Sequence, residues 1–141
     1  MNRVTKIVEQ KIAKILDSKF GVMVEGWDAK AFTVVGIYAN NYLSSNLDDQ
    51  FILLAASPMF DEESLTASTH AAFIVDTVAL YGKDLSAIIF LVADNTETMP
   101  ATARVLRVPF IGCASHRLNL SIEMYTQSDY QQLIEKITII W

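Results

Sequence analysis

The chain has 141 residues, of which 52% are hydrophobic and 19% are charged, so it can bury a core and is not expected to be disordered. Its formal net charge of -5 argues against a domain that binds nucleic acid by itself, because neutralisation of phosphates dominates that affinity. The single cysteine excludes an internal disulfide and a cysteine-rich zinc site. We expect one domain over residues 1–141.

The apolar runs of the chain are short, and residues 1–19 mix charged with apolar side chains. Such runs do not reach the length that crosses a bilayer, and the start of the chain lacks the pattern of a signal peptide. We therefore expect a soluble, intracellular protein with no membrane partner.

The first half of the chain predicts one helix and three strands. Residues 3–18 place apolar side chains three and four positions apart, which is one stripe of a helix. The β-rich runs 20–27, 31–39 and 50–56 are joined by short polar segments, including 40–49, and should pair as an antiparallel meander. Gly26 predicts a bulge or a close backbone approach in the first strand.

The second half alternates helices with strands. Pro58 and the acidic residues 61–63 precede a helix predicted over 64–81, and Gly82 suits its end. The remaining predicted elements are a buried strand at 86–93, a short helix at 100–106, a strand at 108–112 and helical segments at 115–126 and 129–137.

This order of elements predicts an α/β fold. The later strands, which are separated by helices, should join the meander in parallel through right-handed crossovers. The result is a mixed five-stranded sheet in the order 3-2-1-4-5, with helices on both faces. In this sheet the first and fourth strands are neighbours.

Two carboxylates, Glu25 and Asp94, fall near the carboxyl ends of these neighbouring strands, where open α/β sheets bind ligands. Facing carboxylates could share Mg²⁺, and two such ions can promote phosphodiester cleavage. The alternative is structural: Asp94 caps the turn into the next helix, and Glu25 is a solvated residue at a strand end.

Cys113 and His116 have the spacing of half a zinc site. Structural zinc takes four ligands, and the other histidine, His70, lies on the preceding predicted helix, so we expect no zinc. The alternative is that Cys113 is a small buried residue and that His116 begins a helix with a local hydrogen bond. Trp27 is interpreted as a core or sheet-face aromatic residue.

Five ordered segments resemble the catalytic domain of hAT transposases, especially its oomycete-type versions. They are FGVMVEGW at 20–27, LLAASP at 53–58, DEESL at 61–65, VADN at 92–95 and GCASHRLNL at 112–120. The resemblance divides the chain into a leading helix at 1–19, a matching core at 20–126 and a C-terminal helix or tail at 127–141.

The resemblance implies a ribonuclease-H-like fold whose ancestral chemistry is metal-dependent DNA cleavage and strand transfer. Asp94 stands at the family's second catalytic aspartate, and Glu25 stands where the first is expected. Both would hold Mg²⁺ or Mn²⁺. The further positions in the family's motifs are Asn95, Cys113, His116 and Arg117.

The chain also departs from the family. Glu25 carries one methylene more than aspartate, and a misplacement of about 1 Å can cost on the order of a hundredfold in rate. Met99 stands where the family often has asparagine. The family's third carboxylate follows an inserted helical domain, and only Glu123 and Glu135 could replace it. We therefore expect a truncated domain that is inactive alone.

Three functions follow as hypotheses. The leading one is a transposase-derived domain in the nucleus, whose family binds DNA although this acidic chain alone binds it weakly or not at all. The second is a protein-interaction or dimerisation module, because residues 137–141 form an apolar segment. The third is a small nuclease that uses a divalent metal, Glu25, Asp94 and a late glutamate.

Overall fold

The computed structural model describes residues 3–29, 32–41, 44–46, 50–59 and 66–129. The elements in chain order are α1 (Arg3–Ile15), β1 (Phe20–Ala29), β2 (Phe32–Asn40), β3 (Phe51–Met59), α2 (Ala67–Leu80), η3 (Leu85–Ala87), β4 (Ile88–Ala93), α3 (Thr98–Leu106), β5 (Phe110–Gly112) and α4 (Ala114–Asp129).

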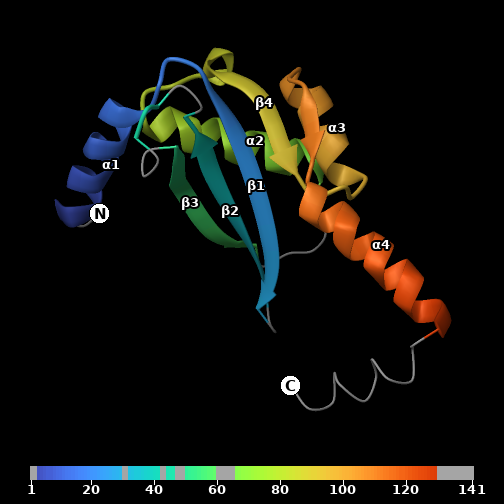
Figure 1. The fold of residues 1–141 in the computed structure, drawn as a ribbon. Coiled ribbons are helices and arrows are strands. Elements are labelled where there is room, and N and C mark those ends of the chain that lie inside the picture. The colour runs from blue at the N-terminus through green and yellow to red at the C-terminus, as the bar shows by residue number, and fades with distance from the viewer. Residues whose placement is uncertain (1–2, 30–31, 42–43, 47–49, 60–65, 130–141) are drawn as a thin grey trace.

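The strands form one five-stranded sheet in the order β3-β2-β1-β4-β5 (Figure 1). β2 pairs antiparallel with both β1 and β3, whereas β4 pairs parallel with both β1 and β5. The predicted α/β fold and strand order are therefore confirmed, including the neighbouring positions of the first and fourth strands.

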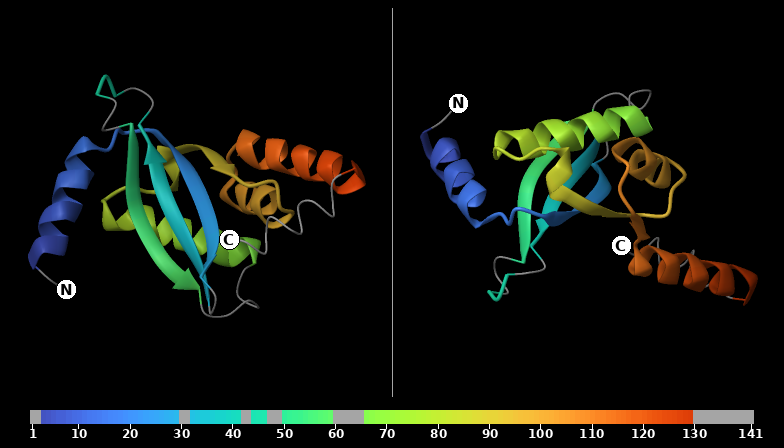
Figure 2. Two further views of the ribbon diagram at one scale, coloured as in Figure 1. Left: turned by 60° about the horizontal axis from the view of Figure 1, so that its bottom comes forward. Right: turned by 90° about the horizontal axis from the view of Figure 1, so that it is seen from above.

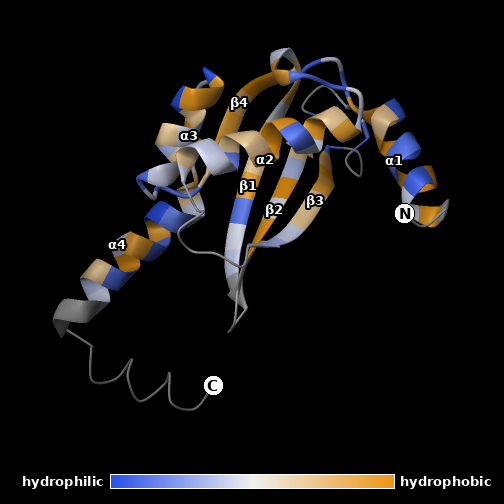
Figure 3. Ribbon diagram, turned by 180° about the vertical axis from the view of Figure 1, so that it is seen from behind, coloured by the Kyte–Doolittle hydropathy of each residue, from blue (hydrophilic) through white to orange (hydrophobic). Residues whose placement is uncertain are grey.

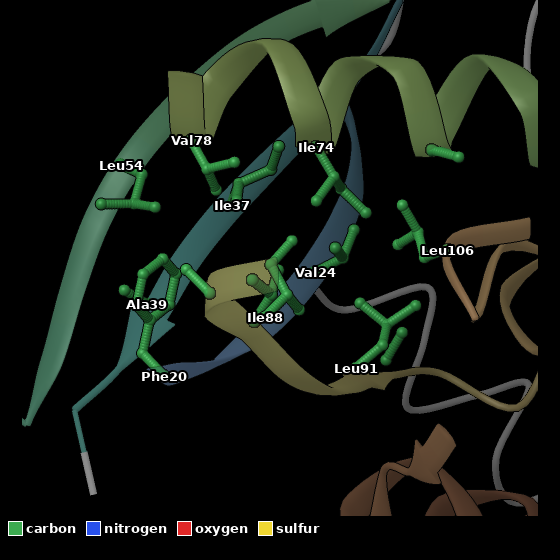
Figure 4. Close-up of a cluster of buried hydrophobic side chains, with 14 of the residues drawn as sticks. Phe20, Val24, Ile37, Ala39, Leu54, Ile74, Val78, Ile88, Leu91 and Leu106 are labelled. Carbon is green, nitrogen blue, oxygen red and sulfur yellow. The ribbon is translucent and has the colours of Figure 1, made fainter. Parts of the chain in front are cut away.

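The core lies between the sheet and α2. Alternate residues of the strands point to one face, because successive side chains of a strand face opposite ways. α2 and α3 cover that face (Figure 2). The side chains that fill the layer, drawn in Figure 4, include Phe20, Val24, Ile37, Leu54, Ile74, Val78, Leu91 and Leu106, all buried. Each such burial contributes roughly 1.5–3 kcal/mol.

The ends of α2 are set by local signals. The Thr66 side chain accepts a hydrogen bond from the backbone N–H of Thr69 at 3.2 Å and so caps the helix start. Gly82 follows the helix with a φ of 70°, as its predicted place at the helix end suggests. The helix thus begins at Ala67 rather than at residue 64, while residues 61–65, including the acidic ones, lie outside the described part.

Several predicted strand ends differ from the observed ones by one to three residues, and two of these differences have an identifiable cause. β3 continues through Pro58, which pairs with Val34, because an edge strand tolerates a residue without an N–H. The strand predicted from residue 86 begins only at Ile88. Its first residues form the 3-10 turn η3, because the Asp84 carboxylate accepts a hydrogen bond from Ser86 N–H at 2.8 Å.

The tight glycine of β1 is Gly21 and not Gly26. Gly26 pairs regularly with Val35, and the nearest atom to a Cβ placed on it is 4.0 Å away, so the predicted bulge or close approach is wrong. A Cβ on Gly21 would lie 2.1 Å from the ring of Phe90. This restriction comes from the neighbouring strand β4, which the local sequence does not reveal.

Two helices lie outside the central layers, α1 on the β3 side and α4 on the β5 side (Figures 1 and 2). Hydrophobic and hydrophilic residues alternate along both (Figure 3). The predicted apolar stripe of α1 is only partly covered, since Val4, Ile7 and Val8 are exposed while Ile12 and Ile15 are half-buried. α1 also ends at Ile15, three residues before the predicted end.

The face of the sheet opposite α2 carries exposed apolar side chains. Trp27, Phe51, Leu53 and Ile111 alternate with core residues along their strands and are 46%, 56%, 47% and 48% exposed. Trp27 is thus a sheet-face aromatic residue, one of the two interpretations offered. We call this surface the open face.

Among the described residues, no helix combines the length and the hydropathy that a bilayer crossing requires.

Candidate functional site

Glu25, which lies within β1, is beside Asp94, which directly follows the end of β4. Met23 of β1 pairs with Val92 of β4, and the same parallel register continued by two residues sets Glu25 opposite Asp94. Val24, which precedes Glu25, and Ala93, which precedes Asp94, are both buried on the core face of the sheet. Because successive side chains of a strand face opposite ways, the two carboxylates lie on the other face. The predicted juxtaposition of the two carboxylates is therefore present, but the predicted position of Glu25 near a strand end is wrong, because β1 continues to Ala29.

Both residues line one pocket with a volume of about 300 Å³. α4 forms its other wall, which brings Cys113 and His116 to the same place. The complete lining within the described residues is Val24, Glu25, Gly26, Asp94, Cys113, Ser115, His116 and Asn119. Four of the predicted site residues thus meet here, and Ser115 and Asn119 are additions that the sequence interpretation missed. Their signal was helical spacing, because Asn119 lies three residues after His116 and four after Ser115.

Asp94 also performs the structural role offered as the alternative. Its Oδ1 accepts hydrogen bonds from the backbone N–H of Thr96 at 3.0 Å and from the Thr96 hydroxyl at 2.6 Å. These bonds shape the turn that leads into α3. Within the described residues Oδ2 makes no hydrogen bond, so the turn role leaves one carboxylate oxygen for a ligand.

Cys113 immediately precedes α4 and His116 lies in its first turn, and both are half-buried. The Cys113 N–H donates to the carbonyl of Ala93 at 2.7 Å, which continues the pairing of β5 with β4. Cys113 is thus less buried than the structural alternative required. The Asn95 amide and the Arg117 guanidinium are hydrogen-bonded to each other beside this junction, at 3.1 Å.

His70 was set aside as a residue of the preceding helix, yet it lies close enough to Asp94 to feel its charge. It is only 5% exposed on the buried side of α2. Burial lowers the pKa of His70 below its ordinary value, and the negative charge of Asp94 partly opposes that shift. The sequence offered a signal for this burial, because Ile74 and Thr77 lie four and seven residues further along the helix and so share a face with His70.

The donors around the pocket suit a hard cation. Glu25 and Asp94 provide carboxylate oxygens, and Ser115 and Asn119 provide a hydroxyl and an amide oxygen. Among the described residues, no three His, Cys, Asp or Glu side chains form a ready metal-binding group. Glu123 of α4 does not line the pocket, and Glu135 lies outside the described residues.

No family model matches the chain, and no curated protein matches its sequence. The resemblance to hAT transposases therefore stays a prediction carried by the five quoted segments.

Proposed function

We propose that the chain is a transposase-derived, ribonuclease-H-like domain of the hAT type, whose pocket holds Mg²⁺ or Mn²⁺ between Glu25 and Asp94. The observation that carries the proposal is that Glu25, Asp94, Cys113 and His116, from three separate segments, line one pocket. By the same resemblance the protein acts in the nucleus on DNA. It does not complete cleavage and strand transfer alone.

The residues divide into two walls. Glu25, within β1, and Asp94, after the end of β4, bind the cation. A pair of carboxylates completed by water is a usual environment for Mg²⁺. Ser115, His116 and Asn119 on the α4 wall offer hydrogen bonds to phosphate oxygens. A bound cation would supply Lewis-acid polarisation of a phosphoryl oxygen.

Two features oppose activity of the domain by itself. The Glu25 carboxylate extends one methylene further than the aspartate of the family, and positional errors of about 1 Å can cost on the order of a hundredfold in rate. The net charge of -5 also weakens attraction to DNA phosphates.

Calorimetric titration with Mn²⁺ tests the proposed site. The wild type should bind the ion, and Asp94→Asn should weaken binding at least about tenfold, because replacing even residues that only support a metal ligand costs about 10–100-fold. Asp76→Asn makes the same chemical change at an exposed position on α2 and should bind as the wild type does. No binding by the wild type, or equal binding by Asp94→Asn, would overturn the proposal.

A plasmid-nicking assay separates this proposal from the nuclease alternative. We expect no Mn²⁺-dependent nicking by the wild type at high protein concentration. Nicking that Asp94→Asn abolishes would show that the domain is an active nuclease, and the inactive-domain part of the proposal would be wrong.

A second candidate function is self-association, which exposed apolar side chains on α4 favour. Leu118, Ile122 and Tyr125 lie four and three residues apart on one stripe and are 60%, 51% and 71% exposed. Exposed apolar groups in such a row mark interaction surfaces. The apolar segment at 137–141 lies outside the described residues.

Sedimentation over a range of concentrations tests this function. The wild type should associate as its concentration rises, and Ile122→Glu should shift it toward the monomer. Val105→Glu, at a 51% exposed position on α3, is the matched control and should leave association unchanged. A strictly monomeric wild type would exclude this second function.

A further inference from the structure

Within the described residues, apolar packing does not set the orientation of α4. Residues 117–125 of the helix are all exposed, and the preceding strand β5 has only three residues. Figure 1 shows α4 leaving the sheet beyond β5. Yet this helix carries Ser115, His116 and Asn119 into the pocket. The described contacts that join α4 to the end of β4 lie at the amino-terminal junction of the helix.

The Asn95 side chain spans that junction. Its Nδ2 donates to the carbonyl of Cys113 at 3.1 Å, and its Oδ1 accepts from the Arg117 Nε at 3.1 Å. The Cys113 carbonyl also accepts from the Arg117 N–H at 3.2 Å, in the first turn of α4. One amide thus joins the residue after Asp94 to the backbone at the start of α4 and to a side chain one turn further along.

Gly112 provides the space for this amide. A Cβ at residue 112 would lie 2.0 Å from Asn95 Oδ1, 3.0 Å from its Cγ and 3.1 Å from the Arg117 Nη2. Atoms do not approach that closely, so any side chain at residue 112 would displace the amide. The glycine is required for space, since Gly112 is not among the positive-φ glycines.

We propose that Asn95, clamped between Gly112, Cys113 and Arg117, is a positioning residue that holds the α4 wall of the pocket opposite the carboxylates. In this inference, the role of the wall rests on the proposed function. The clamp itself rests only on the geometry of the junction. Asn95 acts through Cys113 and Arg117 and touches no ligand.

Amide hydrogen exchange measured by NMR tests the clamp. In Asn95→Ala the Cys113 and Arg117 amides should exchange about tenfold faster, because two hydrogen bonds that hold the junction are lost. The Ile74 amide of α2 is the internal reference and should change little. Asn119→Ala, which alters the same wall without touching the clamp, should leave all three rates unchanged.

Arg117→Lys provides a second variant at an exposed position that does not endanger folding. It keeps the charge but removes the planar donor to Asn95, so exchange should rise about threefold. Unchanged exchange at Cys113 and Arg117 in both variants would overturn the proposal. Equal acceleration at Ile74 would overturn it too, since the effect would then be global.

Mn²⁺-induced line broadening of the His116 ring protons tests the positioning role. In the wild type a bound ion should broaden them strongly, because the effect falls with the sixth power of distance. In Asn95→Ala the affinity for Mn²⁺ should change little while the broadening falls, and unchanged broadening would overturn the positioning role. If the wild type binds no Mn²⁺, the proposed function fails, whereas hydrogen exchange still decides the clamp.

Discussion

The helices α2 and α4 are similar in length, yet they are held in opposite ways. α2 buries five side chains, including His70, Ile74 and Val78, against the sheet. α4 exposes the side chains of residues 117–125 and is joined to the sheet by hydrogen bonds around Asn95. Apolar packing therefore decides where the core helix lies, while a few polar groups decide where the wall of the pocket lies.

α1 resembles α4 in this respect. The fully buried side chain of Asn41 donates to the Ile15 carbonyl at 3.0 Å and accepts from Asp17 N–H at 3.3 Å, at the carboxyl end of α1. Lys83 Nζ donates to the Leu16 carbonyl at 3.0 Å. The outer helices thus share one means of attachment, in which side chains form hydrogen bonds with backbone groups at a helix end.

The largest expected effect separates the two kinds of helix. Ile74→Ala on α2 should lower the free energy of unfolding by about 3 kcal/mol, because it leaves a cavity at a position that is 1% exposed. Ile122→Ala on α4 should change it by less than about 0.5 kcal/mol. Urea denaturation measures both, and similar losses would show that α4 packs as tightly as α2.

The next largest expected effect concerns the attachment of α1. Asn41→Ala should cost about 2 kcal/mol in urea denaturation, because the variant loses the hydrogen bonds to Ile15 and Asp17 and leaves these part-buried backbone groups without them. Asn119→Ala is the control on α4 and should change stability by less than about 0.5 kcal/mol. A loss below about 0.5 kcal/mol for Asn41→Ala would mean that the apolar contacts of Ile12 and Ile15 hold α1 instead.

His70 makes the core helix sensitive to pH. Because its folded-state pKa is lowered, the unfolded chain binds a proton more readily, so the contribution is fully present above the unfolded pKa of about 6.5. Stability should fall below that pH, by less than about 1.4 kcal/mol per pH unit, until the lowered folded-state pKa is reached.

Denaturation of His70→Phe between about pH 7.5 and pH 5 measures this contribution as the part of the pH dependence that the variant loses. His116→Gln, which replaces the half-buried histidine on α4, should retain most of this pH dependence. A profile that is unchanged in His70→Phe would show that the imidazole titrates as it does in the unfolded chain.

The smallest effect concerns the start of α2. Thr66→Ala should cost about 1 kcal/mol, because it removes the hydroxyl that caps the Thr69 N–H. Ser121→Ala on α4 removes a hydroxyl that bonds back to the Arg117 carbonyl at 2.9 Å, and it should cost less than about 0.5 kcal/mol. Equal losses in urea denaturation would show that the hydroxyl of Thr66 does not act as a cap.

The sequence by itself determined the elements and their pairing. Apolar periodicity identified every described strand and α-helix, although not the 3-10 turn η3, and the short links among β1, β2 and β3 required an antiparallel meander. The helices before β4 and β5 required parallel crossovers, which placed Glu25 beside Asp94. These inferences succeeded because periodicity and connection length are local properties of the chain.

Only the tertiary structure decided which polar groups matter. Asn41 sits in a segment that looks like an exposed turn, yet it is fully buried because the end of α1 lies against it. Gly112 and Asn95 are 17 positions apart, and their mutual fit appears only when β4 and β5 lie side by side. Hydrogen bonds between distant segments depend on atomic positions that no local pattern encodes, so the core was predictable and the wall of the pocket was not.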